Sequence, residues 1–162
     1  MVRHLLDSYQ MSQVELAASM NVTQSAVSQW ASGLRTPKGK DSTTIERAID
    51  ALDTEARYVD TGWWNQKAVI PVALWHPVFI PSGRFRLPQR IEWSGTDEAR
   101  WRSASSTFDL LDAYRLVITE GRAADITAWV DPAMLWAHFD EVLWPRGFRE
   151  PWAEALSGWK LD

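Results

Sequence analysis

The chain has 162 residues, of which 46% are hydrophobic and 23% are charged, a composition that excludes disorder along its whole length. Its net charge of −4 excludes nucleic-acid binding by overall positive charge, so any such binding needs a local basic patch. The absence of cysteine excludes disulfides, thiolate metal sites and cysteine nucleophiles.

Three short helices are predicted at the start of the chain, the first over residues 2–9. Ser12 and Glu15 form a capping box for the second helix, which extends to about Met20. Asn21 follows, and asparagine tolerates the left-handed backbone conformation that a tight turn between helices requires. The spacing therefore predicts two helices joined by a turn of three residues.

The third helix is predicted over residues 24–30, with Thr23 as its N-cap and Gly33 at its end. Its apolar side faces a core, while its outward side is short and polar. Such a face fits the major groove of DNA, where glutamine can form two hydrogen bonds to adenine and serine can bond several bases. The predicted base-contacting residues are Gln24, Ser25, Ser28 and Gln29.

A fourth helix is predicted over residues 43–58, so that the first part of the chain holds four or five helices. Thr43 and Glu46 form a second capping box, and apolar residues then recur at helical spacing. The loop before this helix, LRTPKGK, is basic. Residues 1–40 therefore form the locally basic stretch of an otherwise acidic chain.

The segment MSQVELAASMNVTQSAVSQWASGLRTP resembles the helix-turn-helix of the phage Cro/repressor (Xre) family. The resemblance covers about residues 2–55 and implies that Gln13 clamps a DNA phosphate and braces Gln24. Asn21 departs from the family pattern, in which glycine is commoner. The resemblance assigns phosphate contacts to Gln13, Thr23, Arg35, Lys38 and Lys40. The alternative is a plain helical hairpin whose polar face is merely solvated.

One such module makes few base contacts, each worth about 1–3 kcal/mol of discrimination, whereas specific sites need roughly 4–10 kcal/mol over non-specific binding. We therefore expect a homodimer on double-stranded DNA, reading two half-sites about 34 Å apart in a palindromic operator. The sequence leaves the dimer surface open.

The composition changes near residue 60, after which ten of the 11 tryptophans and seven of the eight prolines occur. We predict a mainly α-helical domain over residues 1–60 and a small α+β, Trp-rich domain for partner binding or dimerisation over residues 61–162. Residues 63–93 read as extended segments, interrupted by prolines. Three helices follow, starting at Thr107, at Asp131-Pro132 with an apolar face that includes Leu143, and at Glu150-Pro151.

No enzymatic site is expected. His76 and His138 are the only histidines after residue 60, and His138 lacks a second histidine one helical turn away, so neither a metal nor a cofactor is predicted. There is no Gly-rich phosphate loop and no Ala-Gly bond of the kind that self-cleaving repressors cut. The most apolar stretch, residues 68–80, is shorter than the roughly 20 residues of a membrane span, so a cytoplasmic protein without a membrane partner is expected.

The tryptophans allow two interpretations. They form a core, or some are exposed and bind a protein partner, since Trp and Arg dominate such interfaces. The candidate partner-binding residues are Trp63, Trp64, Trp75, Arg84, Arg86 and Arg90. The arginines could instead belong to a solvated loop or contact additional phosphates.

The run FDLLDAYRLVITEGRAADITAWVDPAMLW, followed by LWPRGFREPW, weakly resembles C-terminal parts of regulators encoded beside nucleotidyltransferase-like toxins. Two functions are thus considered. The first is a sequence-specific repressor. The second is an antitoxin that blocks a toxin through its C-terminal domain and represses its own operon.

Overall fold

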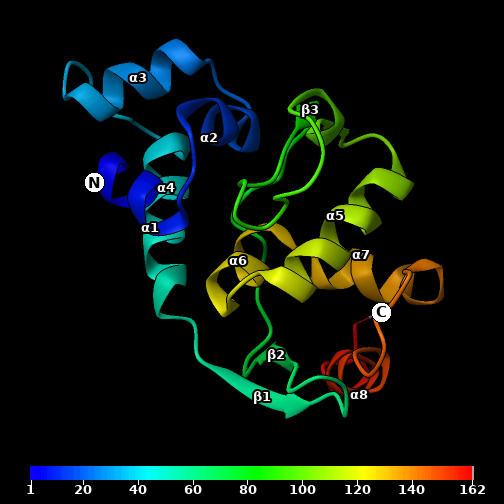
Figure 1. Ribbon diagram of the computed structural model, residues 1–162. Coiled ribbons are helices and arrows are strands. Elements are labelled where there is room, and N and C mark those ends of the chain that lie inside the picture. Colours follow the sequence, from blue (N-terminus) through cyan, green and yellow to red (C-terminus); the bar gives the residue numbers. More distant parts are fainter. Residues whose placement is uncertain (162) are drawn as a thin grey trace.

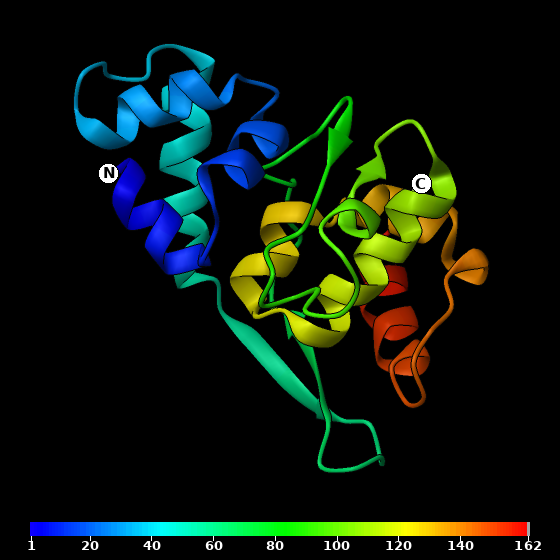
Figure 2. The same ribbon diagram turned by 45° about the horizontal axis from the view of Figure 1, so that its top comes forward.

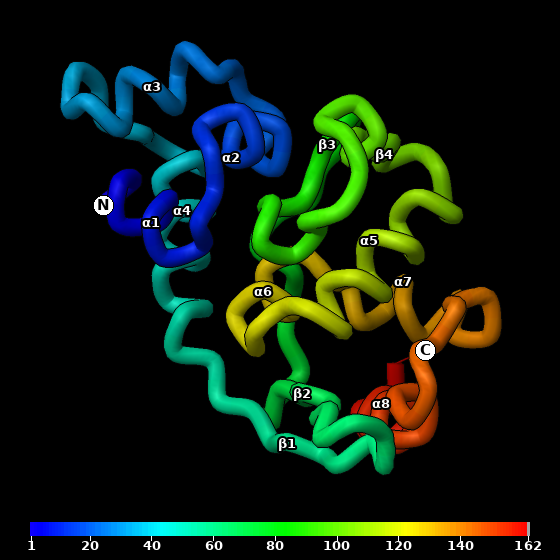
Figure 3. The backbone as a smooth tube through the Cα atoms, viewed as in Figure 1, coloured from blue at the N-terminus to red at the C-terminus, as the bar shows by residue number. Residues whose placement is uncertain are grey.

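The computed structural model describes residues 1–161 and places helices on two sides of an irregular central segment (Figure 1). The first four helices lie together on one side, and the chain then descends into a β-hairpin. The long segment that follows the hairpin runs up between the two groups of helices before α5 begins (Figure 3). The first four helices are α1 (Val2–Tyr9), α2 (Gln13–Met20), α3 (Gln24–Ser32) and α4 (Lys40–Asp50).

The first three helices confirm the prediction, because their caps form as the sequence indicates. The backbone N–H of Glu15 donates to Ser12 Oγ at 3.1 Å, and the N–H of Ser12 donates to Glu15 Oε2 at 2.8 Å. Asn21 has a left-handed conformation with φ 57°. These local interactions satisfy backbone groups that would otherwise lack partners at the helix ends.

The predicted helix over residues 43–58 is wrong at both ends. Helix α4 already begins at Lys40, after Gly39 with φ 58°, and Thr43 Oγ1 donates to the carbonyl of Gly39 instead of capping a helix. After the short 3₁₀ turn η1 (Ala51–Asp53), the chain becomes strand β1 (Ala56–Asp60). Pairing with β2 (Lys67–Pro71) thus overrides the helical spacing of the apolar residues, as tertiary context commonly does.

The remainder is α+β, as predicted, with two two-stranded antiparallel sheets among the described residues. Strand β1 pairs with β2, and β3 (Arg84–Phe85) pairs with β4 (Arg102–Ser103). The loop of the β1–β2 hairpin projects beyond the helices (Figure 2), whereas β2 itself packs against α6 and α8. Only β2 and β3 are regular within the predicted extended region 63–93. The helices are α5 (Thr107–Glu120), α6 (Ala123–Trp129), α7 (Pro132–Ala137) and α8 (Arg149–Gly158).

Helix α6 is the element that the sequence analysis missed. All its residues are buried, so it has no polar stripe from which helical periodicity could be read. The helix start predicted at Asp131-Pro132 is confirmed, but α7 ends at Ala137. Leu143, expected on its apolar face, is 74% exposed for this reason.

The hydrophobic core runs without interruption from α1 to α8. Tyr9 of α1 packs edge-on against both Phe79 and Trp129, with ring centroids 6.3 and 5.8 Å apart, and its hydroxyl donates to the carbonyl of Ala48 at 2.6 Å. Residues on either side of position 60 therefore share one core. The division at residue 60 stays a prediction, in which residues 1–60 bind DNA and residues 61–162 serve partner binding or dimerisation.

No helix within residues 1–161 combines the length and the apolar character that crossing a bilayer requires.

Candidate nucleic-acid interface

The outward face of α3 is polar and accessible. Gln24, Ser25 and Ser28 are exposed, and Gln29 is half-buried. On the opposite side of the helix Val27 is fully buried, which fixes α3 against the core. The four predicted base-contacting residues thus share one solvent-facing surface, which lies at the outer edge of the molecule (Figure 1).

Both ends of α3 are held by local hydrogen bonds. Thr23 Oγ1 accepts the N–H of Ala26 at 3.1 Å, so the threonine acts as the predicted N-cap. Gly33 ends the helix with φ 80°, a left-handed conformation that glycine adopts without strain. The backbone N–H of Arg35 then donates to the carbonyl of Gln29 at 3.2 Å. These bonds fix the backbone of α3 at both ends.

The basic loop lies beside this face. Arg35, Lys38 and Lys40 are exposed, and the Arg35 guanidinium reaches Gln29 Oε1 at 3.4 Å. None of these three cations forms an ion pair within residues 1–161. A surface hollow of about 490 Å³ between α3 and the loop is lined by Ala26, Gln29, Trp30, Arg35, Thr36, Pro37, Lys38 and Asp41. The loop therefore presents uncompensated positive charge next to the polar face.

Gln13 and Gln24 each occupy the first position of a helix, as the resemblance requires. No hydrogen bond joins their side chains in the part of the chain that the structure describes. The implied brace and the phosphate contact of Gln13 stay predictions.

Arg3 is a further candidate that the sequence did not assign to the interface. It lies on α1, it is exposed, and its Nε donates to the carbonyl of Ala31 at 2.9 Å. The bond places a fourth free cation at the carboxyl end of α3. Only the packing of α1 against α3 brings it there, so no local signal could have located it.

The side-chain hydrogen bonds of Asn21 account for an asparagine at this position, where the family pattern more often has glycine. Its Nδ2 donates to the carbonyl of Ile80 at 2.8 Å, and its Oδ1 accepts the N–H and the hydroxyl of Ser82 at 2.7 and 3.0 Å. A glycine could form the same turn but none of these three bonds. The turn between α2 and α3 is therefore tied to the central segment of the chain.

We expect Asn21→Gly to lower the free energy of unfolding by about 1 kcal/mol, since it keeps the left-handed turn and loses the side-chain bonds. Asn21→Ala should cost more, because alanine also resists the positive φ. Urea unfolding checks the order, and a glycine variant as stable as the parent would show that the bonds contribute nothing.

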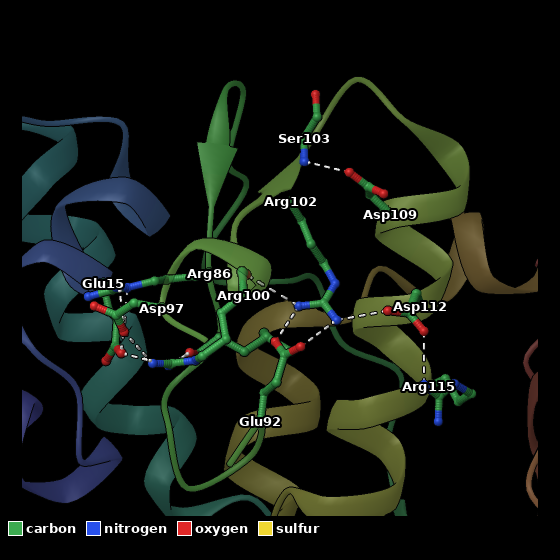
Figure 4. Close-up of polar contacts among 11 residues, drawn as sticks. Glu15, Arg86, Glu92, Asp97, Arg100, Arg102, Ser103, Asp109, Asp112 and Arg115 are labelled. Carbon is green, nitrogen blue, oxygen red and sulfur yellow. Dashed lines mark hydrogen bonds and ion pairs between the residues drawn. The ribbon is translucent and has the colours of Figure 1, made fainter. Parts of the chain in front are cut away.

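Glu15, whose side chain is almost fully buried, forms a second link between the helix-turn-helix and the rest of the chain. While Oε2 completes the capping box, Oε1 accepts Arg100 Nη2 at 3.0 Å and lies 3.9 Å from Arg86 Nε (Figure 4). Arg100 also donates to the carbonyl of Leu87 at 2.6 Å. One carboxylate thus caps α2 and fixes it to the C-terminal part of the chain.

Arg86 and Arg90, predicted as partner-binding residues, are engaged in contacts within the chain. The Arg86 side chain is only 12% exposed because it pairs with Glu15 and with Asp97, the latter at 3.3 Å. Arg90 binds the buried Asp125 with both Nη atoms and donates from Nε to the carbonyl of Tyr9 at 2.8 Å. Both arginines therefore stabilise the junction between the two halves of the chain.

Arg84 does remain at the surface. Its side chain is 63% exposed, it pairs with Glu98 at 3.3 Å and it lies over the ring of Trp101. It stays a candidate contact residue.

The tryptophans divide between the two interpretations. Trp152 is fully buried and Trp129 almost so, while Trp64 is 83% exposed and Trp63 40%. The exposed pair lies in the loop between β1 and β2, with Arg146 over the Trp63 ring at 4.4 Å. Trp75 is half-buried and donates to the carbonyl of Val130 at 2.7 Å, so it is not a free surface residue.

A separate charged network holds β4 to α5 (Figure 4). Arg102 binds Glu92 and donates to Asp112 at 2.8 Å, and Asp112 accepts a second bond from Arg115 at 2.9 Å. Burial alone would raise the pKa of Asp112, but the hydrogen bonds from the two arginines outweigh it and lower that pKa below its usual value.

This arrangement predicts an acid-dependent loss of stability. A carboxylate with a lowered pKa contributes stability above its unfolded value of about 3.9, and the contribution is lost as the pH falls through the lower folded-state pKa. Asp112→Asn should therefore be less stable than the parent near neutral pH and should lose less stability on acidification below about pH 4. Urea unfolding at several pH values measures both slopes, and parallel slopes would contradict the assignment.

No group of three or more potential metal ligands gathers within residues 1–161. His138 instead contacts Glu141 at 3.0 Å, on the neighbouring helical turn.

Comparison with known proteins identifies the first part of the chain. The family model described as Helix-turn-helix matches residues 2–55, the stretch that holds α1 to α4. No curated protein and no solved structure matches the chain significantly. Regulators with this domain bind DNA, and the match supports a DNA-binding transcriptional regulator. Residues 2–55 therefore form a helix-turn-helix domain of the Cro/repressor (Xre) type.

Proposed function

We propose that this protein is a sequence-specific DNA-binding repressor that binds a palindromic operator as a homodimer. The observation that carries the proposal is the exposed polar face of α3, flanked by free cations, in a domain that matches the helix-turn-helix family. Residues 1–60 hold this DNA-reading surface, and residues 61–162 supply partner binding or dimerisation.

In the proposed complex α3 lies in the major groove. Gln24 and Gln29 donate to and accept from adenine edges, and Ser25 and Ser28 bond to neighbouring bases. The Arg35–Gln29 contact at 3.4 Å positions the glutamine before binding, which reduces the entropy lost on ordering it. Gln13, Thr23 and the loop cations Arg35, Lys38 and Lys40 contact phosphates, which fixes the helix in the groove without reading sequence.

A dimer follows from the size of this face. Four base-reading side chains on one short helix discriminate too weakly to find one site in a genome. Two copies related by a two-fold axis double the contacts and require half-sites one helical turn apart, about 34 Å. A dimer bound across a promoter blocks polymerase access, which makes repression the expected outcome.

Two substitutions separate base reading from phosphate binding. Gln24→Ala should cost about 1–3 kcal/mol on the preferred duplex and relax one base position in each half-site. Lys38→Ala should weaken binding to all duplexes alike and lower the salt slope by about one. Gln89→Ala, at an exposed position outside the helix-turn-helix, is the matched control.

Fluorescence anisotropy over a range of salt concentrations measures these effects. A Gln24→Ala variant with unchanged sequence preference would refute the proposed role of α3.

The exposed Trp63 and Trp64 favour a second candidate, an antitoxin that covers a toxin with its C-terminal part. Two neighbouring tryptophans in a projecting loop are typical of residues that dominate a protein interface. If so, the product of the adjacent reading frame should stop growth when expressed alone. Co-expression of this protein should restore growth, and Trp64→Ala should weaken the rescue. A harmless neighbour would exclude this candidate.

A further inference from the structure

The outer edge of β1 is a strand edge without a partner. Among the described residues β1 pairs with β2 alone, one residue opposite one at all five positions, so the strand contains no bulge. Strand β2 packs against α6 and α8, and β1 lies on the outside of the hairpin in both views (Figures 1 and 2). A row of backbone N–H and C=O groups on such an edge can pair with a further strand.

The hydrogen bonds at the two ends of the hairpin show which residues of β1 face outward. The N–H of Val72 donates to the carbonyl of Glu55 at 3.0 Å, and the N–H of Thr61 donates to the carbonyl of Gln66 at 3.2 Å. In an antiparallel pair, residues that bond to the neighbouring strand alternate with residues that do not. Since Glu55 and Thr61 both bond across the hairpin, every second residue between them does so too. The residues whose backbone groups point outward are therefore Ala56, Tyr58 and Asp60.

These three residues leave the edge open. Their backbone groups have no hydrogen-bond partner within residues 1–161. Tyr58 is 67% exposed, Asp60 is also exposed, and Ala56 is half-buried. The strand contains neither proline nor lysine, the residues that commonly keep edge strands from pairing. The edge of β1 can therefore accept another strand along its whole length.

A second copy of β1 fits this edge. When it runs antiparallel about a two-fold axis, each outward N–H lies opposite an outward carbonyl, because the two edges are identical. Only with the axis at Tyr58 are all five residues of β1 paired. Arg57 then lies opposite Val59 of the second copy, and Asp60 lies opposite its Ala56.

Charge favours the same register. With the axis at Tyr58 no two like charges lie directly opposite each other. An axis at Arg57 would place two guanidinium groups opposite each other, and an axis at Asp60 would do the same with two carboxylates. Like charges in directly opposite positions destabilise a strand pair.

The edge lies far from the DNA-reading surface. Figures 1 and 2 place α3 and the β1–β2 hairpin at opposite ends of the molecule, so pairing at β1 leaves the polar face of α3 uncovered in both copies. This self-contact is therefore additional to the operator dimer proposed above, and it does not rest on DNA binding.

We propose that two copies of this protein join through the outer edges of their β1 strands, antiparallel and centred on Tyr58. The product is one four-stranded sheet in the order β2–β1–β1–β2. Each of the three outward-facing residues donates one backbone hydrogen bond across the axis and accepts another. The two Tyr58 side chains come to lie side by side, and a sheet of more than two strands is more stable than a lone hairpin.

Amide hydrogen exchange of the full-length protein, followed by two-dimensional ¹H–¹⁵N NMR at micromolar and millimolar concentrations, tests the pairing. The higher concentration should slow exchange at Ala56, Tyr58 and Asp60 by about tenfold once about nine-tenths of the protein is paired, since only unpaired copies exchange there. The amides of Arg57 and Val59 already bond to β2, so they should be protected at both concentrations. Sedimentation equilibrium measures the dissociation constant of the pair.

Two lysine substitutions locate the contact. Tyr58→Lys places two like charges opposite each other at the axis and should raise the dissociation constant by about tenfold. Val69→Lys is the matched control, because Val69 is the cross-strand neighbour of Tyr58 on the same face but lies on β2, away from the edge. It should leave the dissociation constant nearly unchanged.

Three results would overturn the proposal. The first is unchanged exchange of the three outward amides at millimolar concentration, whether the protein is then a monomer or a dimer through another surface. The second is a dissociation constant that Tyr58→Lys does not alter. The third is an equal effect of the two lysine substitutions. DNA binding by Tyr58→Lys should equal that of the parent protein, so the outcome is independent of the proposed role of α3.

Discussion

Replacing Arg90 by methionine should lower the free energy of unfolding by about 3 kcal/mol, because it leaves the fully buried Asp125 without its main counter-charge. The cost lies at the lower end for buried pairs, since Asp125 keeps the backbone N–H of Arg122 at 2.7 Å and its Nε at 3.4 Å. The bond from Arg90 to the carbonyl of Tyr9 is lost as well. Urea unfolding, evaluated with an unchanged m-value, measures the effect.

Two variants test the cause. Arg84→Met breaks a pair that is mostly exposed, so it should cost less than about 1 kcal/mol. Asp125→Asn added to Arg90→Met removes the uncompensated charge while keeping an acceptor for the helix cap, and it should recover part of the loss. If Arg90→Met costs no more than Arg84→Met, the buried pair does not stabilise the fold.

Arg100→Met should cost a similar amount, about 3 kcal/mol, through the buried Glu15. Glu15 retains the N–H of Ser12, but the nearest remaining cation, Arg86, is 3.9 Å away. The carbonyl of Leu87 also loses a bond of 2.6 Å. The α3 surface is untouched, so the variant should bind DNA with unchanged sequence preference at temperatures at which it is folded.

The double variant Glu15→Gln/Arg100→Met separates charge from shape. Glutamine can still accept the N–H of Ser12, so the capping bond survives while the buried charge disappears. We expect this variant to unfold at a higher urea concentration than Arg100→Met alone. Equal stability of the single and double variants would show that the unpaired charge is not what destabilises the protein.

Together these pairs show how the helix-turn-helix is joined to the rest of the chain. Glu15 and Asn21 lie on or next to α2, and each is bound to the central segment or to the residues just beyond it. Arg90 and Arg122 reach back to the carbonyls of Tyr9 and Ser8 at the end of α1. The first helices are thus held by charged and polar contacts in addition to the shared core.

The features that could be predicted from the sequence are those set by residues close together in the chain. The capping box of Ser12 with Glu15, the cap at Thr23 and the end at Gly33 are set within three or four residues, and all are confirmed. The polar face of α3 follows from the same spacing. The helix predicted over residues 43–58 failed because strand pairing between residues about ten positions apart outweighed the local pattern.

Contacts between distant residues could not be read in this way. Arg86 and Arg90 stand in a polar, proline-containing run typical of an exposed loop, but their partners Glu15 and Asp125 lie 71 and 35 positions away. From the sequence, Asn21 is only a mild substitute for glycine. No residue close to it in the chain indicates that its side chain bonds to Ile80 and Ser82. The number of tryptophans was compatible with burial in a core and with exposure at a binding surface. Only the packing of the folded chain decides which tryptophans are buried and which are exposed.

We propose that the polar face of α3 distinguishes one DNA sequence from another. Selection of bound duplexes from a random pool by the full-length protein tests it most directly. We expect enrichment of one motif repeated with two-fold symmetry at a spacing of about 34 Å, and loss of preference at one position per repeat with Gln24→Ala. A folded protein that enriches no motif over many rounds would contradict it.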